Sequence, residues 1–350
     1  MAKIVTFFNH KGGVGKTTSS YNVAWGLSMA GKRVLMIDAD PQCNLTEIAV
    51  ESELLYGLDE EWSQPSLVDN VDSNFFIENN IYEYLVNYIQ PIPEKPIPKI
   101  RTFQKQDASN LELLPGFVRF AELEKTIALS VANVPGLGHV PTSVYSAIKK
   151  IGVGFDYIII DLSPALSATN QLLLMLSDYF IVPANPSIFS RQALMNLGDI
   201  FKSWNRELSG FEVFIKRIKP LPKMLGIICQ NYRPYSRADE KNTKSAKRFE
   251  VMMSELNQRA ETLAVDLSGF GMALTKNEFN DIFHNAVPYR IADIPDFNQL
   301  VVVSELEKIP VIAINNKILQ KHEINTKQYR EKVDDFIIQY DCIVKGLLKI

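Results

Sequence analysis

Short apolar runs recur along the chain, and each is followed by a polar or glycine-rich segment. The clearest are residues 4–8, 34–37 and 157–160, and the last two lead directly into Asp38 and Asp161. Runs of this length without alternation indicate strands buried on both faces, as in a parallel sheet. Because helix-like stretches separate the runs, we expect an α/β fold, with a mostly parallel, twisted sheet covered by helices on both faces.

A glycine-rich loop follows the first run. Residues 11–18 read Lys-Gly-Gly-Val-Gly-Lys-Thr-Thr, and a helix-like stretch continues to Met29. The backbone N–H groups of such a loop and the helix N-terminus form a cradle for phosphate oxygens. In this type of loop Lys16 reaches the terminal phosphates and the Thr17 hydroxyl ligates Mg²⁺. The sequence therefore predicts a P-loop NTPase that binds ATP through Lys11, Gly12, Gly13, Val14, Gly15, Lys16, Thr17 and Thr18.

The loop departs from the ordinary P-loop at its start. The usual pattern has a glycine where this chain has His10, and a second lysine, Lys11, stands at the head of the loop. The order Lys-Gly-Gly-x-Gly-Lys-Thr resembles the deviant Walker A motif of the ParA/MinD family of ATPases. This resemblance implies that Lys11 reaches across a dimer interface to the nucleotide of the partner.

Two acidic strand ends extend the resemblance. The segment from Asp38 through Asp40 to Pro-Gln resembles the Walker A′ element of ParA proteins. It implies that Asp40 orients or deprotonates the attacking water and that Asp38 holds a water on Mg²⁺. The run ending in Asp161 resembles a Walker B strand, whose carboxylate faces the outer shell of the metal. Such chemistry needs a carboxylate near the water and acceptors around the metal. A helix cap or a loop ion pair is the structural alternative for these carboxylates.

Other matches are less specific. The resemblance places Asn231 against adenine and Pro288 in the segment that closes the base pocket. A strand-end Asn is equally a turn former. Relatives usually have a proline where this chain has Ser163, and glycine commonly occupies the place of Cys43. The resemblance covers positions 2–50 and 110–310 well, and it is weak elsewhere.

Composition narrows the class of protein. The cysteines Cys43, Cys229 and Cys342 are too widely spaced for a disulfide framework or a metal site, which argues against iron–sulfur relatives. No run approaches the ~20 apolar residues of a spanning helix, and there is no signal peptide. We therefore expect a cytoplasmic protein with one ATPase domain over residues 1–350.

The net charge of −3 hides two regions of opposite charge. Ten acidic residues and no Lys or Arg occur between Glu47 and Glu83, and a proline-dense stretch follows at 91–98. We interpret residues 51–107 as an acidic and proline-rich insertion. It is either a solvated surface with a loop or a docking surface for a partner protein.

Residues 216–248, in contrast, hold ten Lys or Arg against two acids. Four of the basic residues recur at i, i+4, i+7 and i+11, which places them on one helical face. Such a stripe suits contact with DNA phosphates of any sequence, although a solvated basic helix has the same pattern. Because ParA proteins bind bulk DNA as ATP-bound dimers, we favour DNA contact by Arg237, Lys241, Lys244 and Arg248.

The C-terminal segment, about residues 317–350, carries an apolar stripe at helical spacing that includes Phe336, Tyr340 and Leu347. MinD-type relatives end in an amphipathic helix that enters the membrane surface. The acidic residues Asp334 and Asp335 suit an anionic lipid surface poorly. We therefore interpret the segment as a closing helix packed on the sheet, and the membrane helix remains the alternative.

Together these features predict a ParA-like, Mg²⁺-dependent ATPase with Lys11, Lys16 and Asp40 as catalytic residues. Thr17, Asp38 and Asp161 are the expected metal residues. The resemblance implies an ATP-sandwich homodimer, association with the nucleoid, and slow hydrolysis that a ParB-like or other partner stimulates. The alternatives are a MinD-like membrane-associated ATPase and a regulatory switch that acts on a protein partner.

Overall fold

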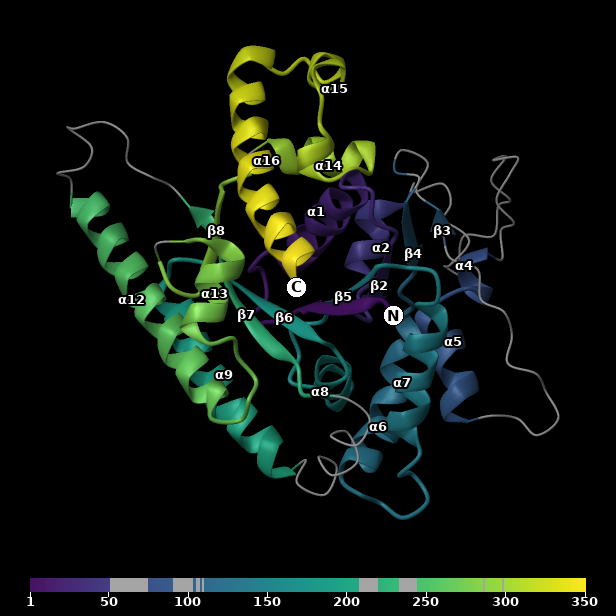
Figure 1. The fold of residues 1–350 in the computed structure, drawn as a ribbon. Helices are drawn as coiled ribbons and strands as arrows, with labels where there is room; N and C mark the ends of the chain where they lie inside the picture. Colours follow the sequence, from purple (N-terminus) through teal and green to yellow (C-terminus); the bar gives the residue numbers. More distant parts are fainter. Residues whose placement is uncertain are drawn as a thin grey trace.

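The apolar runs form the strands of one twisted sheet (Figure 1). The structure, a computed structural model, describes residues 1–50, 75–90, 103–104, 108, 110–207, 220–232, 244–285, 287–297 and 299–350. Within these residues the strand order is β3-β4-β2-β5-β1-β6-β7-β8. The strands are β1 (Lys3–Phe7), β2 (Val34–Ala39), β3 (Phe103–Gln104), β4 (Leu111–Leu114), β5 (Tyr157–Leu162), β6 (Tyr179–Ala184), β7 (Lys223–Tyr232) and β8 (Arg290–Pro295).

Seven of these strands are parallel, and only the short edge strand β3 pairs in the antiparallel direction. Every residue of β2 and β5 is buried, which explains why their sequences do not alternate. The expected parallel α/β sheet is confirmed.

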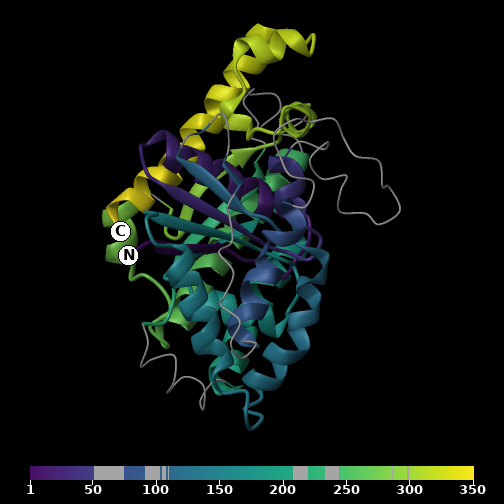
Figure 2. The ribbon, with the colours of Figure 1, turned by 90° about the vertical axis from the view of Figure 1, so that its right-hand side faces the viewer.

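Helices cover both faces of the sheet (Figure 2). On one side α1 packs against α16, and on the other α5, α6, α7, α8 and α9 form a second layer, in which α12 packs beside α9 and against β7. The helices are α1 (Lys16–Met29), α2 (Asn44–Ala49), α4 (Phe75–Glu78), α5 (Ile81–Ile89), α6 (Leu123–Val131), α7 (Val140–Ile151), α8 (Ala168–Met175), α9 (Ile188–Glu207), α12 (Lys244–Ser268), α13 (Lys276–Phe283), α14 (Leu300–Glu307), α15 (Asn316–Lys321) and α16 (Thr326–Lys349), with the 3₁₀ turns η1 (Val118–Glu122) and η2 (Val311–Ala313).

The long C-terminal helix α16 packs on α1 and β8. Its apolar stripe is buried, and the ring of Phe336 stacks on Phe297 with 4.6 Å between the ring centroids. The Tyr157 hydroxyl on β5 donates to the carbonyl oxygen of Leu347 at 2.8 Å. Since each large apolar side chain contributes roughly 1.5–3 kcal/mol when fully buried, this face stabilises the fold. Among the described residues, no helix is long and apolar enough to cross a bilayer.

The range 51–107 is not uniform. Within it, α5 begins at the cap residue Asn80, whose side chain accepts from the Glu83 N–H, and packs against α7. Ile81 and Leu85 of this helix are fully buried. This part of the range therefore belongs to the core, while 51–74 and 91–102 lie outside the described residues.

Candidate nucleotide-binding site

Three strand ends meet at the carboxyl edge of the sheet. The strand β5 lies between β1 and β2, and its Asp161 is in register with both Phe7 and Asp38. The loop that follows β1 therefore begins beside both carboxylates. Open α/β sheets bind ligands at this edge, because the loops there diverge and leave a crevice.

The glycine-rich loop is held open at its base. Asn9, which is fully buried, donates to the carbonyl oxygen of Pro183 at 2.8 Å and accepts from the Lys11 N–H at 3.0 Å. Gly13 and Gly15 adopt left-handed φ angles of 68° and 73°, which side chains rarely tolerate. Sequence reasoning missed Asn9, although its position just before the loop was the available signal.

Several backbone N–H groups of the glycine-rich loop have no hydrogen-bond acceptor among the described residues. Among the described residues, no hydrogen-bond acceptor faces the N–H groups of Gly12, Gly13 or Gly15. A Cβ atom placed on Gly12 or Gly13 would meet no heavy atom within 4 Å. The first N–H groups of α1 also lack intrahelical partners. This open set of donors fits phosphate oxygens.

Lys16 lies at the first position of α1 and is 7% exposed. Its ammonium group donates to the carbonyl oxygen of Lys11 at 3.4 Å. Burial lowers the pKa of Lys16, while the Asp161 and Asp40 carboxylates oppose that shift. A buried ammonium group beside open N–H donors is suited to bind a polyphosphate.

Asp38 is fully buried and fixed by Thr46 of α2. The Thr46 N–H and hydroxyl donate to one carboxylate oxygen at 2.8 and 2.7 Å, and the same hydroxyl accepts from the Gly116 N–H at 2.8 Å. Burial raises the pKa of Asp38 to about 6, although the hydrogen bonds from Thr46 oppose the rise. Nothing in the sequence pattern identified Thr46, because its role depends on how α2 returns to the sheet.

Asp161 is also fully buried, and among the described residues neither of its carboxylate oxygens receives a hydrogen bond of normal geometry. Burial raises the pKa of Asp161, and the charge of Asp38 adds to the rise; the nearby Thr17 hydroxyl and Lys16 act in the opposite direction. Buried acceptors without donors are suited to the hydration shell of Mg²⁺. No cluster of three or more His, Cys, Asp or Glu forms a metal cage in the described part of the chain. P-loop sites do not need one, because phosphates and waters supply most Mg²⁺ ligands.

Asp40 is 5% exposed and follows β2, two residues after Asp38. Its N–H donates to Asp38 at 3.2 Å, and one of its carboxylate oxygens accepts from the Gln42 N–H at 2.9 Å. Its charge acts on Lys16 and on Asp161. The structure thus brings Lys16, Asp38, Asp40 and Asp161 close together.

Lys11 is held within its own protomer. Its ammonium group lies 3.3 Å from the hydroxyl oxygens of both Ser187, just before α9, and Ser190, in the first turn of α9. Burial lowers the pKa of Lys11. No sequence motif marks these two serines, which follow a strand far along the chain from Lys11.

The two departures from the family pattern have structural explanations. Cys43 adopts a left-handed φ of 56° at the start of α2, a conformation that glycine adopts without strain. Burial raises the pKa of the Cys43 thiol to about 12. The Ser163 hydroxyl and carbonyl oxygens both accept from the Asn170 side chain at 2.9 Å, which fixes the loop after β5.

The expected base pocket requires a correction. Asn231 is exposed at the carboxyl end of β7 with a left-handed φ of 55°. Pro288 precedes β8, at the opposite end of that strand, because Arg290 pairs with Ile227 in the middle of β7. Pro288 therefore lies away from the carboxyl edge of the sheet.

At the carboxyl edge the neighbour of β7 is Pro295, which pairs with Tyr232. The preceding residue of β7, Gln230, points to the nucleotide loop. Its amide donates to the Ser19 hydroxyl at 2.7 Å, and its side chain lies 3.0 Å from an ideal Cβ on Gly15.

The expected DNA stripe is mostly outside the described residues. Arg237 and Lys241 lie there, and Lys244 begins α12 with a side chain that is not described. Arg248 is exposed on α12 beside the exposed Lys247.

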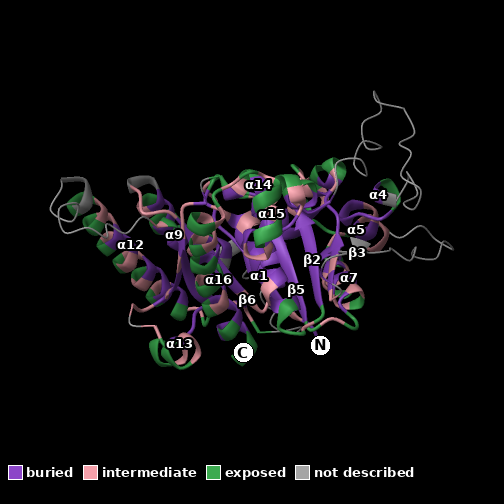
Figure 3. Cartoon of the chain, turned by 90° about the horizontal axis from the view of Figure 1, so that it is seen from above, coloured by how far each residue is buried: buried purple, intermediate pink, exposed green. Residues whose placement is uncertain are grey.

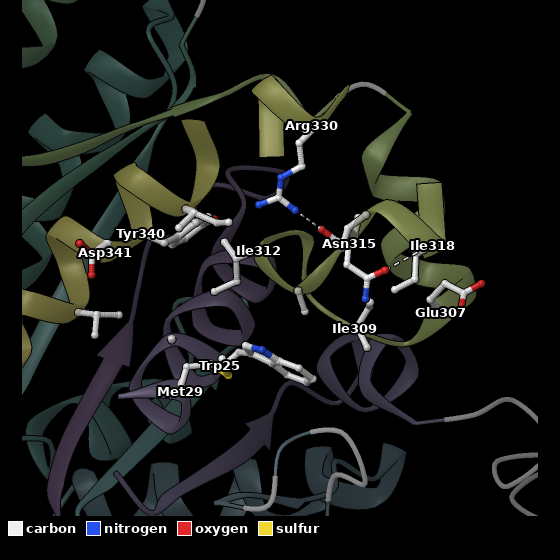
Figure 4. A pocket seen from close by; sticks show the side chains of 15 residues that line it. Trp25, Met29, Glu307, Ile309, Ile312, Asn315, Ile318, Arg330, Tyr340 and Asp341 are labelled. Carbon is white, nitrogen blue, oxygen red and sulfur yellow. Dashed lines mark hydrogen bonds between the residues drawn. The ribbon is translucent and has the colours of Figure 1, made fainter. Parts of the chain in front are cut away.

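A hollow of about 650 Å³ lies between α1, η2, α15 and α16 (Figure 4). Trp25, Ile312 and Tyr340 contribute to its wall, and Arg330 donates to the Ile314 carbonyl oxygen at its rim. None of the expected site residues lines this hollow. It is therefore separate from the nucleotide loop.

Comparisons with known proteins agree with this geometry. A family model described as an AAA domain matches residues 2–210, more than half of the chain. The sporulation initiation inhibitor protein Soj of Bacillus subtilis (strain 168) is 29% identical over 197 residues, which cover 56% of this chain and 64% of Soj. A virulence plasmid ParA family protein from Chlamydia psittaci is 27% identical over 237 residues, 63% of this chain and 76% of that protein. The chain belongs to the ParA/MinD family of ATPases.

Among solved structures, a plasmid partition protein from Borrelia burgdorferi B31 bound to AMPPNP has a TM-score of 0.56 at 19% identity. The similarity covers 100% of this chain and 99% of that one, and it shows a shared fold. The chain is thus a P-loop ATPase close to the ParA-type partition proteins.

Proposed function

We propose that this ParA-type chain is a Mg²⁺-dependent ATPase whose ATP-bound dimer binds DNA of any sequence and drives plasmid or chromosome partition, or the positioning of another cargo. The observation that carries the proposal is the convergence of Lys16, Asp38, Asp40 and Asp161 at one edge of the sheet, beside a loop of free N–H donors. The names of the Soj, plasmid partition and virulence plasmid relatives support the partition role.

Each residue of the site has a defined task in this proposal. The loop N–H groups and Lys16 bind the phosphates, and the Thr17 hydroxyl ligates Mg²⁺ with Asp38 and Asp161 in its outer shell. When bound, Mg²⁺ neutralises charge on the transferred phosphoryl group. Asp40 orients or deprotonates the attacking water. Asn231 and Pro295 flank the end of β7, where the base would lie.

The dimer is the second part of the proposal. Lys11 from each protomer would complete the site of the other and stabilise charge that develops on the phosphoryl group. It must first leave the hydroxyl groups of Ser187 and Ser190 in its own protomer. Hydrolysis is expected to be slow alone and faster with a ParB-like or other activating partner. The protein would be cytoplasmic and associated with the nucleoid in its ATP state.

The membrane-associated alternative finds little support in α16. Phe336, Tyr340 and Ile343 are at most 1% exposed and pack in the core. The helix would have to leave the sheet before this stripe met lipid. The regulatory-switch alternative relied on residues 51–107, most of which lie outside the described residues.

The deciding experiment measures binding to a random-sequence DNA duplex with ATP, with ADP and without nucleotide. We expect binding with ATP only, and binding that weakens steeply as salt rises, because each phosphate contact releases counterions. Absence of DNA binding in all three states would remove the partition function. Binding of anionic liposomes instead would favour the membrane-associated ATPase.

A further inference from the structure

A basic cleft lies at the amino edge of the sheet, opposite the nucleotide loop. It has a volume of about 730 Å³, and its walls include Lys3, Lys32, Arg33 and Lys149. Both chain termini lie on this side of the molecule (Figure 3). The four cations come from three separate segments: the start of β1, the turn before β2 and the last turn of α7.

Asp156 holds two of these segments together, the start of β1 and the turn before β2. Asp156 accepts from the Arg33 N–H at 2.8 Å, and its own N–H donates to the Arg33 carbonyl oxygen at 2.7 Å. The Lys3 N–H donates to the Asp156 carbonyl oxygen at 2.9 Å. The cations therefore project from a backbone framework that is hydrogen-bonded across the strand starts.

The acidic groups near the cleft are already engaged with the backbone. One Asp156 oxygen faces the Arg33 N–H, and an Asp178 oxygen accepts from the Ile4 N–H at 2.8 Å. Within the described part of the chain, none of the four cations forms an ion pair. At the start of β7, by contrast, Lys223 pairs with Glu278 at 3.0 Å. Lys3, Lys32, Arg33 and Lys149 thus face one carboxylate of the lining, Asp156, so the cleft carries an excess of positive charge.

The lining indicates which anion fits. It contains no Asn, Gln, Ser or Thr among the described residues, so it offers no amide or hydroxyl group for reading base edges. Tyr157 is 3% exposed and does not offer a free ring for stacking. Cations spread over three segments, with no buried polar group between them, suit a chain of phosphates better than one small ligand.

We propose that this amino-edge cleft contacts the phosphate backbone of DNA through Lys3, Lys32, Arg33 and Lys149. The proposal rests on the proposed function, to which it adds a DNA-contacting surface. The cleft lies away from Lys11 and the nucleotide loop, so two protomers that meet at their carboxyl edges leave it accessible.

A purely structural role for these cations makes a different prediction. The carboxyl ends of α1 and α7 lie at this edge, and basic residues near helix carboxyl ends stabilise them by about 0.3–1 kcal/mol. If this were their only role, neutralising them would lower the melting temperature and leave DNA affinity unchanged.

The test compares two triple variants of the full chain. The edge variant carries Lys32→Gln, Arg33→Gln and Lys149→Gln. The control carries Lys125→Gln, Lys317→Gln and Lys327→Gln, which neutralise three exposed lysines on other elements. Fluorescence anisotropy with ATP and Mg²⁺ measures binding to two duplexes of unrelated sequence over a range of salt, alongside ATP affinity and melting temperature.

We expect the edge variant to bind both duplexes more weakly. The slope of the logarithm of the binding constant against the logarithm of the salt concentration should decrease in magnitude by about 1 for each neutralised residue, about 3 in all. Its ATP affinity is expected to equal that of the control. An edge variant that binds DNA as the control does would overturn the proposal, whatever its melting temperature. If it does so while a Lys247→Gln, Arg248→Gln variant loses DNA binding, the partition function stands and only the site is wrong. If the unmodified protein binds no DNA with ATP, the function itself fails.

Discussion

The charged groups at the carboxyl edge of the sheet are buried, whereas those at the amino edge are more exposed to solvent. At the carboxyl edge, Asp38, Asp40, Asp161 and Lys16 are all less than 10% exposed. At the amino edge, cations such as Arg33 are exposed to solvent, and the nearby acid accepts backbone N–H groups. Both edges are built from the same strands, β1, β2 and β5.

The difference follows from the direction of a parallel sheet. Helices that follow parallel strands begin at the carboxyl edge and end at the amino edge. Because of the helix dipole, the carboxyl edge therefore attracts anions and the amino edge attracts cations. At the carboxyl edge, neither oxygen of the buried Asp161 receives a hydrogen bond of normal geometry from the described residues, and a bound nucleotide with Mg²⁺ would supply such partners. The exposed Arg33 and the half-buried Lys3, Lys32 and Lys149 at the amino edge are suited to a large polyanion instead. Variants that act on one edge alone separate these two roles.

The largest effect is expected at Lys16. Replacing it by alanine (Lys16→Ala) leaves buried carboxylates without their cation and removes the phosphate donor. Loss of one partner from a buried charged pair costs about 3–5 kcal/mol, so ATP binding should be abolished within the usual concentration range. Isothermal titration with ATP and Mg²⁺ measures this. Lys149→Ala at the amino edge is the matched control and should bind ATP normally. Equal affinities in both variants would contradict the site.

Asp40→Ala should separate ATP binding from hydrolysis. Removing a group that positions or deprotonates the water lowers the hydrolysis rate by about 10²–10⁴-fold. ATP should still bind, and the dimer should accumulate. Phosphate release and light scattering report the two effects, with the exposed Asp335→Ala as control. Turnover at the rate of this control would show that Asp40 does not assist catalysis.

Asp161→Asn should stabilise the nucleotide-free protein near neutral pH. The buried carboxylate has no hydrogen-bond donor of normal geometry among the described residues, and removing such a charge is worth about 1–3 kcal/mol. Because burial raises the folded-state pKa of Asp161 above that of the unfolded chain, the folded protein holds more protons between the two values. The stability of the unmodified protein therefore falls as pH rises through this window.

The advantage of the Asn variant should accordingly shrink as pH falls. Thermal melts at several pH values without nucleotide measure it. A variant that melts below the unmodified protein at neutral pH would mean that Asp161 already has a stabilising partner. With Mg²⁺ and nucleotide the order should reverse, because the charge then faces the metal.

The smallest effect is expected for Cys43→Gly. A non-glycine residue in the left-handed region is strained by roughly 1–2 kcal/mol, while glycine loses more chain entropy on folding. The Cys43 sulfur also lies 3.1 Å from an ideal Cβ on Gly116, so some packing is lost. We expect net stabilisation below about 1 kcal/mol in denaturant titrations. Clear destabilisation would indicate that the buried thiol contributes more than the strain removes.

The sequence was sufficient for the sheet and for the groups at its carboxyl edge. Apolar runs that end in Asp38 and Asp161 identify buried strands, and the loop at 11–18 has a fixed spacing between lysine and glycines. The sequence was not sufficient to place Pro288 relative to the carboxyl edge, because a short residue pattern does not show at which end of a strand it lies. The register of β7 and β8 places Pro295, and not Pro288, at the carboxyl edge of the sheet.

By itself, the sequence located the glycine-rich loop and the aspartates at the strand ends, because a strand, a loop and a helix start are local and their spacing is set by backbone geometry. Only the tertiary structure decided that Thr46 holds Asp38, that Ser187 and Ser190 hold Lys11, and that Asp161 is buried without a hydrogen bond of normal geometry from the described part of the chain. It also decided that cations from three distant segments share one cleft. These arrangements join residues far apart along the chain, and only the packing of the helices on the sheet brings them together.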